Sequence, residues 1–125
     1  MSILKGKKAE DMACNHLLEK GLKLVEKNYN TKLGEIDLIM EDEEEIVFVE
    51  VKARKSINFG QASEFVDISK QKKIIRTTKL FLQGNPRFNN HMTRFDVFEI
   101  NFTESKKPEL NWIKDAFQIK GFSAI

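Results

Sequence analysis

Two carboxylates and a lysine with the spacing of a reactive site lie in two neighbouring apolar segments, residues 34–40 and 46–52. Asp37 belongs to the first segment, and Glu50 and Lys52 belong to the second. In an extended strand Glu50 and Lys52 point to the same side, and Asp37 can lie beside Glu50 if the segments form a hairpin. Burying such charges is costly unless they are paired or bound to a metal. Two adjacent carboxylates also repel each other unless a cation or proton lies between them.

A hard divalent cation, Mg²⁺ or Mn²⁺, fits this set of side chains. Such an ion takes one or two carboxylates, keeps several waters and completes its shell with phosphate oxygens. It can activate a water and neutralise charge that grows on a phosphodiester. Lys52 would reach the same pocket and bind the scissile phosphate or position the attacking water. Glu10 is expected to close the site as a further metal ligand, and Glu35, on the strand side of Asp37, is an additional candidate.

Each of these residues also has a purely structural interpretation. Glu50 and Lys52 would form a same-face ion pair on an exposed sheet edge. Asp37 would cap a turn, and Glu10 would reach solvent from the rim of its helix. The joint pattern favours a site, because all four residues belong to elements that must pack together.

The first of the elements that must position these residues is a helix over residues 8–20, ended by Gly21. At 100° per residue its apolar side chains form one stripe, made of Ala9, Met12, Ala13, Cys14, Leu17 and Leu18. Glu10 projects inside that stripe. A short extended segment over 22–25 follows and is expected to end at the polar residues 28–30.

The central elements are two strands, residues 34–40 and 46–52, joined by a solvated turn through the acidic run 41–45. Alternation in the first strand and the β-branched and aromatic residues of the second predict an antiparallel hairpin. This hairpin would carry Asp37 on one strand and the other two site residues on its neighbour.

The remaining elements are a loop over 56–66, a helix with Ser69 as N-cap that runs to Gln83, and a strand over 95–102. Residues 111–117 form a last strand or a short helical turn. The order predicts one domain over residues 1–125, of α/β class or α+β by stricter definitions, with a mixed sheet flanked by helices.

Basic residues are unevenly distributed in this chain of net charge +2. The stretch from residue 70 to residue 94 has no Asp or Glu and seven basic residues, Lys70, Lys72, Lys73, Arg76, Lys79, Arg87 and Arg94. Lys72, Arg76 and Lys79 should line the outer face of the second helix. Lys70 to Lys79 are therefore candidates for binding a nucleic acid, although a charged stripe can also be a merely solvated helix face.

Composition excludes several other classes of protein. The start of the chain has no apolar leader, and no segment approaches a membrane-spanning length, so we expect a soluble, cytoplasmic protein with no membrane partner. A single cysteine, Cys14, cannot form an internal disulfide, and two distant histidines cannot build a zinc site. No small-molecule organic cofactor is expected.

Asp37 followed by Glu50 and Lys52 resembles the PD-(D/E)xK nuclease signature, with Ile36 in place of the proline. The chain also resembles the bacterial YraN family of predicted endonucleases, which are similar to archaeal Holliday-junction resolvases. The segments that carry this resemblance are 8–10, 28–29, 34–39, 47–54, 59–60 and 94–97. It implies a restriction-endonuclease-like fold in which Asp37 and Glu50 bind metal, Lys52 is the catalytic lysine, and Glu10 matches the resolvase glutamate of the first helix.

The leading functional hypothesis is therefore a metal-dependent endonuclease that hydrolyses DNA. Branched or junction DNA is favoured by analogy alone, and action on four-way junctions would require a homodimer with two active sites. A non-catalytic nucleic-acid-binding or adaptor protein with the same fold is the alternative, and it predicts salt-sensitive binding without a metal effect. A structural protein with a buried ion network is a third hypothesis, and RNA stays open as a substrate.

Overall fold

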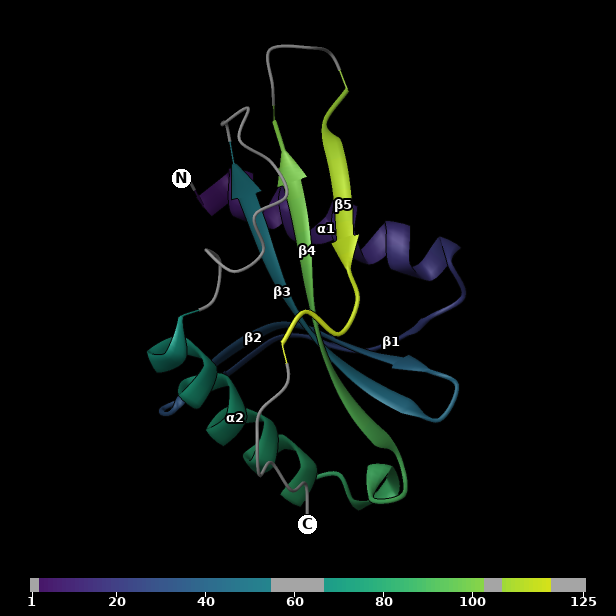
Figure 1. The fold of residues 1–125 in the computed structure, drawn as a ribbon, viewed down its shortest axis with the longest axis vertical. Helices are drawn as coiled ribbons and strands as arrows, with labels where there is room; N and C mark the ends of the chain where they lie inside the picture. Colours follow the sequence, from purple (N-terminus) through teal and green to yellow (C-terminus); the bar gives the residue numbers. More distant parts are fainter. Residues whose placement is uncertain (1–2, 55–66, 103–106, 118–125) are drawn as a thin grey trace.

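The computed structural model describes residues 3–54, 67–102 and 107–117, which form five strands and three helical segments (Figure 1). In chain order these are α1 (Ile3–Glu19), β1 (Lys23–Thr31), β2 (Gly34–Asp42), β3 (Glu45–Arg54), α2 (Ile68–Gln83), the 3₁₀ turn η2 (Pro86–Phe88), β4 (Met92–Asn101) and β5 (Glu109–Ile113). No helix in these three ranges is long and apolar enough to cross a membrane.

The strands form one mixed sheet in the order β1-β2-β3-β4-β5. All neighbouring strands are antiparallel except β3 and β4, which are parallel because α2 and η2 return the chain between them. The predicted hairpin of β2 and β3 is confirmed, with Leu38 opposite Val49 and a turn at the acidic run. This mixed sheet flanked by helices confirms the predicted fold class.

The sheet has a hydrophobic core on each face. In Figure 1, α1 crosses behind the sheet and α2 lies in front of it. The core on the α1 side includes Ala9, Ala13, Leu17, Val47, Val49 and Phe98. The core on the α2 side includes Phe48, Ile74, Phe81, Leu82 and Phe95. Because successive strand residues face opposite sides, β3 contributes to both cores and is held in place from both directions.

The end of α1 follows the sequence prediction. Gly21 has a φ of +97°, a left-handed conformation that favours glycine. Its N–H donates to the Leu18 carbonyl at 3.0 Å, and the Leu22 N–H donates to the Leu17 carbonyl at 3.1 Å. Leu18 itself is 44% exposed, so it lies at the edge of the apolar stripe rather than in the core.

The first strand is longer than the sequence predicted. β1 continues through the polar residues 28–30 to Thr31, because it pairs with β2 along most of its length. Asn28 takes a φ of +51°, which asparagine tolerates better than most residues. The Tyr29 ring packs edge-on against Phe81 of α2, with the ring centroids 5.2 Å apart. Tertiary pairing and one aromatic contact therefore override the weak local strand signal.

The N-cap of the second helix is Asp67, and the prediction of Ser69 was wrong. The Asp67 Oδ1 accepts a hydrogen bond from the Lys70 N–H at 2.8 Å. Both residue types cap helices well, but a carboxylate also interacts favourably with the positive end of the helix dipole. At the other end of the chain, residues 109–113 form a strand, while the expected loop over 56–66 lies outside the described residues.

Candidate active site

Asp37 lies where β2 separates from β3. Backbone pairing between these strands runs from Asp42 opposite Glu45 to Leu38 opposite Val49, which is its last pair. At the next residue, Asp37 Oδ2 accepts a hydrogen bond from the Val51 N–H at 2.8 Å. A side-chain carboxylate thus satisfies a backbone donor that the ladder no longer pairs. This contact fixes Asp37 against the part of β3 that carries Glu50 and Lys52.

Glu50 and Lys52 project from the central strand of the sheet toward the α2 side. Phe48 belongs to the core under α2, and strand alternation places Glu50 and Lys52 on the same face. The Lys52 Nζ lies 3.7 Å from Glu50 Oε1. Since β3 is third of five strands, the interpretation of this pair as an exposed-edge feature is wrong.

A second lysine, Lys70 in the first turn of α2, also reaches this site. Its Nζ donates to Glu50 Oε1 at 2.5 Å, a closer contact than that of Lys52. The sequence grouped Lys70 with the basic residues of the second helix as a candidate for binding a nucleic acid, and the structure places its ammonium group against Glu50. We call Asp37, Glu50, Lys52 and Lys70 the Glu50 cluster.

The charges of the Glu50 cluster perturb one another. Burial, reinforced by the nearby charge of Glu50, raises the pKa of Asp37 from 3.8 to about 7, although the Val51 N–H works in the opposite direction. Burial and the neighbouring Lys70 lower the pKa of Lys52. Burial also opposes the charged form of Lys70, but its contact with Glu50 prevails and raises the pKa of Lys70. Titratable groups perturbed in this way are typical of functional sites.

Glu10 and Glu35 affect the cluster less than Glu50 does. Glu10, on α1, is half-buried and Glu35 is exposed, and the charges of both contribute to the raised pKa of Asp37. Within the described residues, no three His, Cys, Asp or Glu side chains are close enough together to hold a metal ion between them. The structure therefore gathers Asp37, Glu50 and Lys52 as predicted, while the assignment of Glu10 as a ligand stays a prediction.

The cluster fits the donor requirements of Mg²⁺ or Mn²⁺. These ions bind through one or two carboxylates and take their other ligands from water and substrate phosphate. Asp37 and Glu50 would hold the ion, since both favour a nearby positive charge. The carboxyl of Asp37 is protonated more readily than usual, and Glu50 attracts two ammonium groups. A metal site whose ligands are carboxylate and water oxygens, without thiolate or imidazole, is typical of a hard cation.

The remaining basic residues predicted on α2 lie on its exposed face. These are Lys72, Lys73, Arg76 and Lys79. A groove of about 400 Å³ runs beside the start of the helix and is lined by Gly34, Glu35, Asp67, Ser69, Lys70, Lys73 and Ile74. Lys70 belongs both to this groove and to the Glu50 cluster, so the groove adjoins the site.

Sequence reasoning missed Glu99 of β4, which stands opposite Lys52 in the parallel register. Its side chain is fully buried, accepts a hydrogen bond from Asn111 Nδ2 at 3.3 Å and lies 3.7 Å from the Arg54 Nε. An acidic residue between the apolar Phe98 and Ile100 was the available signal, since buried carboxylates need partners.

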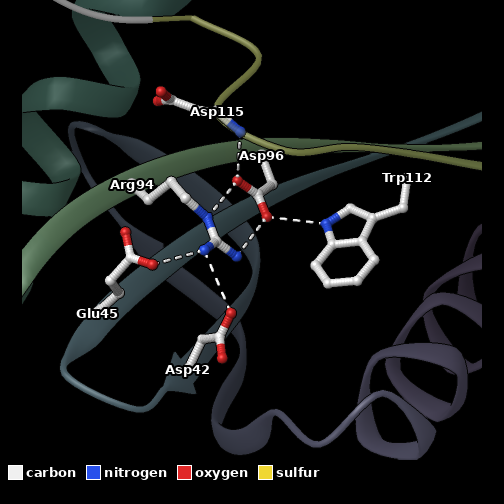
Figure 2. A network of polar contacts seen from close by, with 6 residues as sticks. All are labelled: Asp42, Glu45, Arg94, Asp96, Trp112 and Asp115. Atoms are coloured by element: carbon white, nitrogen blue, oxygen red, sulfur yellow. Dashed lines mark hydrogen bonds and ion pairs between the residues drawn. The ribbon is translucent and has the colours of Figure 1, made fainter.

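A second group of charges, which we call the Arg94 cluster, joins β2, β3, β4 and β5 (Figure 2). Arg94 donates to both oxygens of the fully buried Asp96 at 2.9 and 3.0 Å. It also donates to Asp42 at 3.2 Å and to Glu45 at 2.8 Å. Asp96 accepts two more bonds, from Trp112 Nε1 at 2.8 Å and from the backbone N–H of Asp115 at 2.9 Å. Arg94 was expected only as one of the basic residues, so this role was missed.

Known sequences similar to this chain cover almost its whole length. The family model described as "Uncharacterised protein family UPF0102" matches residues 9–100. A UPF0102 protein of Stutzerimonas stutzeri is 44% identical over 113 residues, which are 90% of this chain and 93% of that protein. Another, of Clostridioides difficile, is 46% identical over 113 residues, 90% of this chain and 96% of that protein. The resemblance to a known family is thus supported, and the chain belongs to the UPF0102 family.

Proposed function

We propose that this protein is a nuclease that uses Mg²⁺ or Mn²⁺ to hydrolyse phosphodiester bonds of DNA. The observation that carries the proposal is that two carboxylates and a lysine lie together at the place where β2 separates from β3. These residues are Asp37, Glu50 and Lys52. A structural role alone explains this arrangement poorly, because burial and Glu50 together make ionised Asp37 unfavourable.

Each residue of the Glu50 cluster has a specific part in the proposed reaction. Asp37 and Glu50 hold the cation, which when bound supplies Lewis-acid activation of a water and neutralises charge on the phosphodiester. Lys52, fixed beside Glu50, donates hydrogen bonds to a non-bridging oxygen of the scissile phosphate or orients the attacking water. Water adds to phosphorus, the phosphorus–oxygen bond to the leaving sugar breaks, and that oxygen takes up a proton.

The substrate is inferred from the charge around the site. The exposed cations of α2, together with the adjoining groove, offer a rigid surface for a polyanion such as a DNA strand. Branched DNA is proposed on the resemblance to resolvases, and a homodimer would supply the two active sites that a four-way junction requires.

The direct test compares wild type with Lys52→Ala on linear, nicked, flapped and four-way-junction DNA, each with Mg²⁺, Mn²⁺ or a chelator. We expect wild type to cut with metal only and Lys52→Ala to lose activity by on the order of 10²-fold or more, with folding and DNA binding kept. Lys23→Ala on β1 removes the same charge from an exposed position away from the site and should cut normally.

Cleavage by Lys52→Ala at the wild-type rate would contradict the role of this lysine. No cutting of any DNA by wild type would contradict the proposed activity and would favour either an RNA substrate, tested with the same structures made of RNA, or the non-catalytic binding protein.

A further inference from the structure

Lys70 is held against Glu50, one of the two carboxylates that hold the metal ion in the proposed function. Its Nζ lies 2.5 Å from Glu50 Oε1, and the Glu50 side chain is only 11% exposed. A divalent cation bound by Asp37 and Glu50 requires a lone pair of that carboxylate. The ammonium group of Lys70 and the cation are both drawn to the same buried carboxylate, and their positive charges repel each other there.

The net charge of the cluster rises from zero to +2 when a divalent cation binds. When all four side chains are ionised, the two carboxylates of Asp37 and Glu50 balance the two ammonium groups of Lys52 and Lys70. A divalent cation adds two positive charges to this balanced set, which makes Lys70 repulsive at its present position and makes the site attractive to a phosphate.

Lys70 also has a place to which it can move. Its side chain is 38% exposed, and it lines the groove of about 400 Å³ together with Ser69 and Lys73. A lysine side chain has four rotatable bonds, so its ammonium group can turn from Glu50 toward this groove without movement of α2.

We propose that Lys70 is a metal-displaced cation: it neutralises Glu50 in the metal-free protein, and binding of Mg²⁺ or Mn²⁺ moves its ammonium group into the groove, where it binds a backbone phosphate of the substrate. This inference rests on the proposed function and deepens it. The affinity for the metal is then lower than it would be without Lys70, and substrate binding depends on the metal.

The test measures metal binding without any nuclease assay. Mn²⁺ is titrated calorimetrically into wild type, Lys70→Met, Lys70→Arg and Lys72→Met, the last being an exposed lysine of the same helix. Removing the competing cation should tighten Mn²⁺ binding by roughly 5-fold or more in Lys70→Met. Lys70→Arg, which keeps the charge, and Lys72→Met should stay close to wild type.

A second measurement follows binding of a short fluorescent DNA duplex by anisotropy, using the Lys52→Ala background so that the duplex stays uncut. Mn²⁺ should strengthen binding when Lys70 is present, and this gain should fall severalfold in Lys70→Met but not in Lys23→Met, which removes an exposed lysine of β1. Equal Mn²⁺ affinity in wild type and Lys70→Met, or no binding of Mn²⁺ at all, would overturn the inference. If wild type cuts DNA but Lys70→Met binds Mn²⁺ no more tightly, the inference is overturned and the proposed function is left intact. If Lys70→Met binds Mn²⁺ more tightly but wild type cuts no DNA, the inference is supported and the result counts against the nuclease.

Discussion

The Glu50 cluster and the Arg94 cluster both join strands of one sheet and differ in how their buried carboxylates are hydrogen-bonded. In the Arg94 cluster, Asp96 is fully buried and accepts four hydrogen bonds, and the guanidinium group donates to three carboxylates. In the Glu50 cluster, burial and Glu50 raise the pKa of Asp37 to about 7, and two lysines converge on one oxygen of Glu50.

This difference separates a structural use of charge from a chemical one. A network in which the buried carboxylate accepts four hydrogen bonds fixes the strands, and that carboxylate needs no further partner. Carboxylates that repel each other at the open end of a hairpin leave room for a cation. The two clusters therefore predict opposite responses to mutation: loss of stability in one, and loss of binding or activity in the other.

The largest expected effect on stability comes from Arg94→Met. This change leaves Asp96 buried without its cation and should lower the free energy of unfolding by about 3–5 kcal/mol in urea denaturation. Arg76→Met removes the same charge from the exposed face of α2 and should cost less than about 0.5 kcal/mol. Similar small losses in both variants would break the proposed distinction, because Arg94 would then behave as a surface residue.

Asp37→Asn should act in the opposite direction and stabilise the metal-free protein. The folded-state pKa of Asp37, about 7, lies above its ordinary 3.8. Between these pH values the folded protein binds more protons than the unfolded chain, so the free energy of unfolding falls as pH rises. This loss of stability is complete above pH 7. Asparagine keeps an oxygen for the Val51 N–H and carries no charge.

We therefore expect the variant to be more stable than wild type by about 2–4 kcal/mol above the folded-state pKa, with the difference vanishing as pH falls toward the ordinary value. Urea denaturation over this pH range, with a chelator present, measures it. A destabilised variant at alkaline pH would show that the Asp37 carboxylate is structural. Saturating Mg²⁺ should reverse the order by stabilising wild type alone.

The smallest effects are expected on the exposed face of α2. Lys72→Ala, Arg76→Ala and Lys79→Ala should each weaken DNA binding by about 1 kcal/mol or less and lower the salt dependence of the affinity by about one ion. Anisotropy titrations at several salt concentrations measure both quantities, with Lys23→Ala on β1 as the control. If a variant that carries all three substitutions keeps the wild-type salt dependence, the DNA-binding surface does not include the exposed face of α2.

Most of the fold was predictable because its elements carry strong local patterns. The β2–β3 hairpin follows from two apolar runs around an acidic turn, and α1 ends at the glycine that the sequence indicates. The full length of β1 was not predictable, because pairing with β2 and packing of Tyr29 on Phe81 extend a polar segment. The start of α2 was missed by two residues because Asp67 and Ser69 are both good N-caps.

Within the site, spacing along the chain predicted only the residues that lie on adjacent strands. Asp37, Glu50 and Lys52 follow from strand alternation and hairpin pairing, which are local. Lys70 is 20 residues from Glu50 in sequence, and the contact between them depends on where α2 crosses the sheet. At 100° per residue Lys70 projects on the side of Ile74 and Phe81, away from the outer stripe, but a helical projection contains no information about the neighbouring strand that it meets.

The central claim, that the carboxylates of Asp37 and Glu50 mark a cation site, is tested most directly by crystals soaked in Mn²⁺. The account predicts an anomalous peak in contact with both carboxylates in wild type, with Lys70 turned away from Glu50, and no such peak in Asp37→Asn. No peak at this position in wild type, with Lys70 still bound to Glu50, would contradict the account.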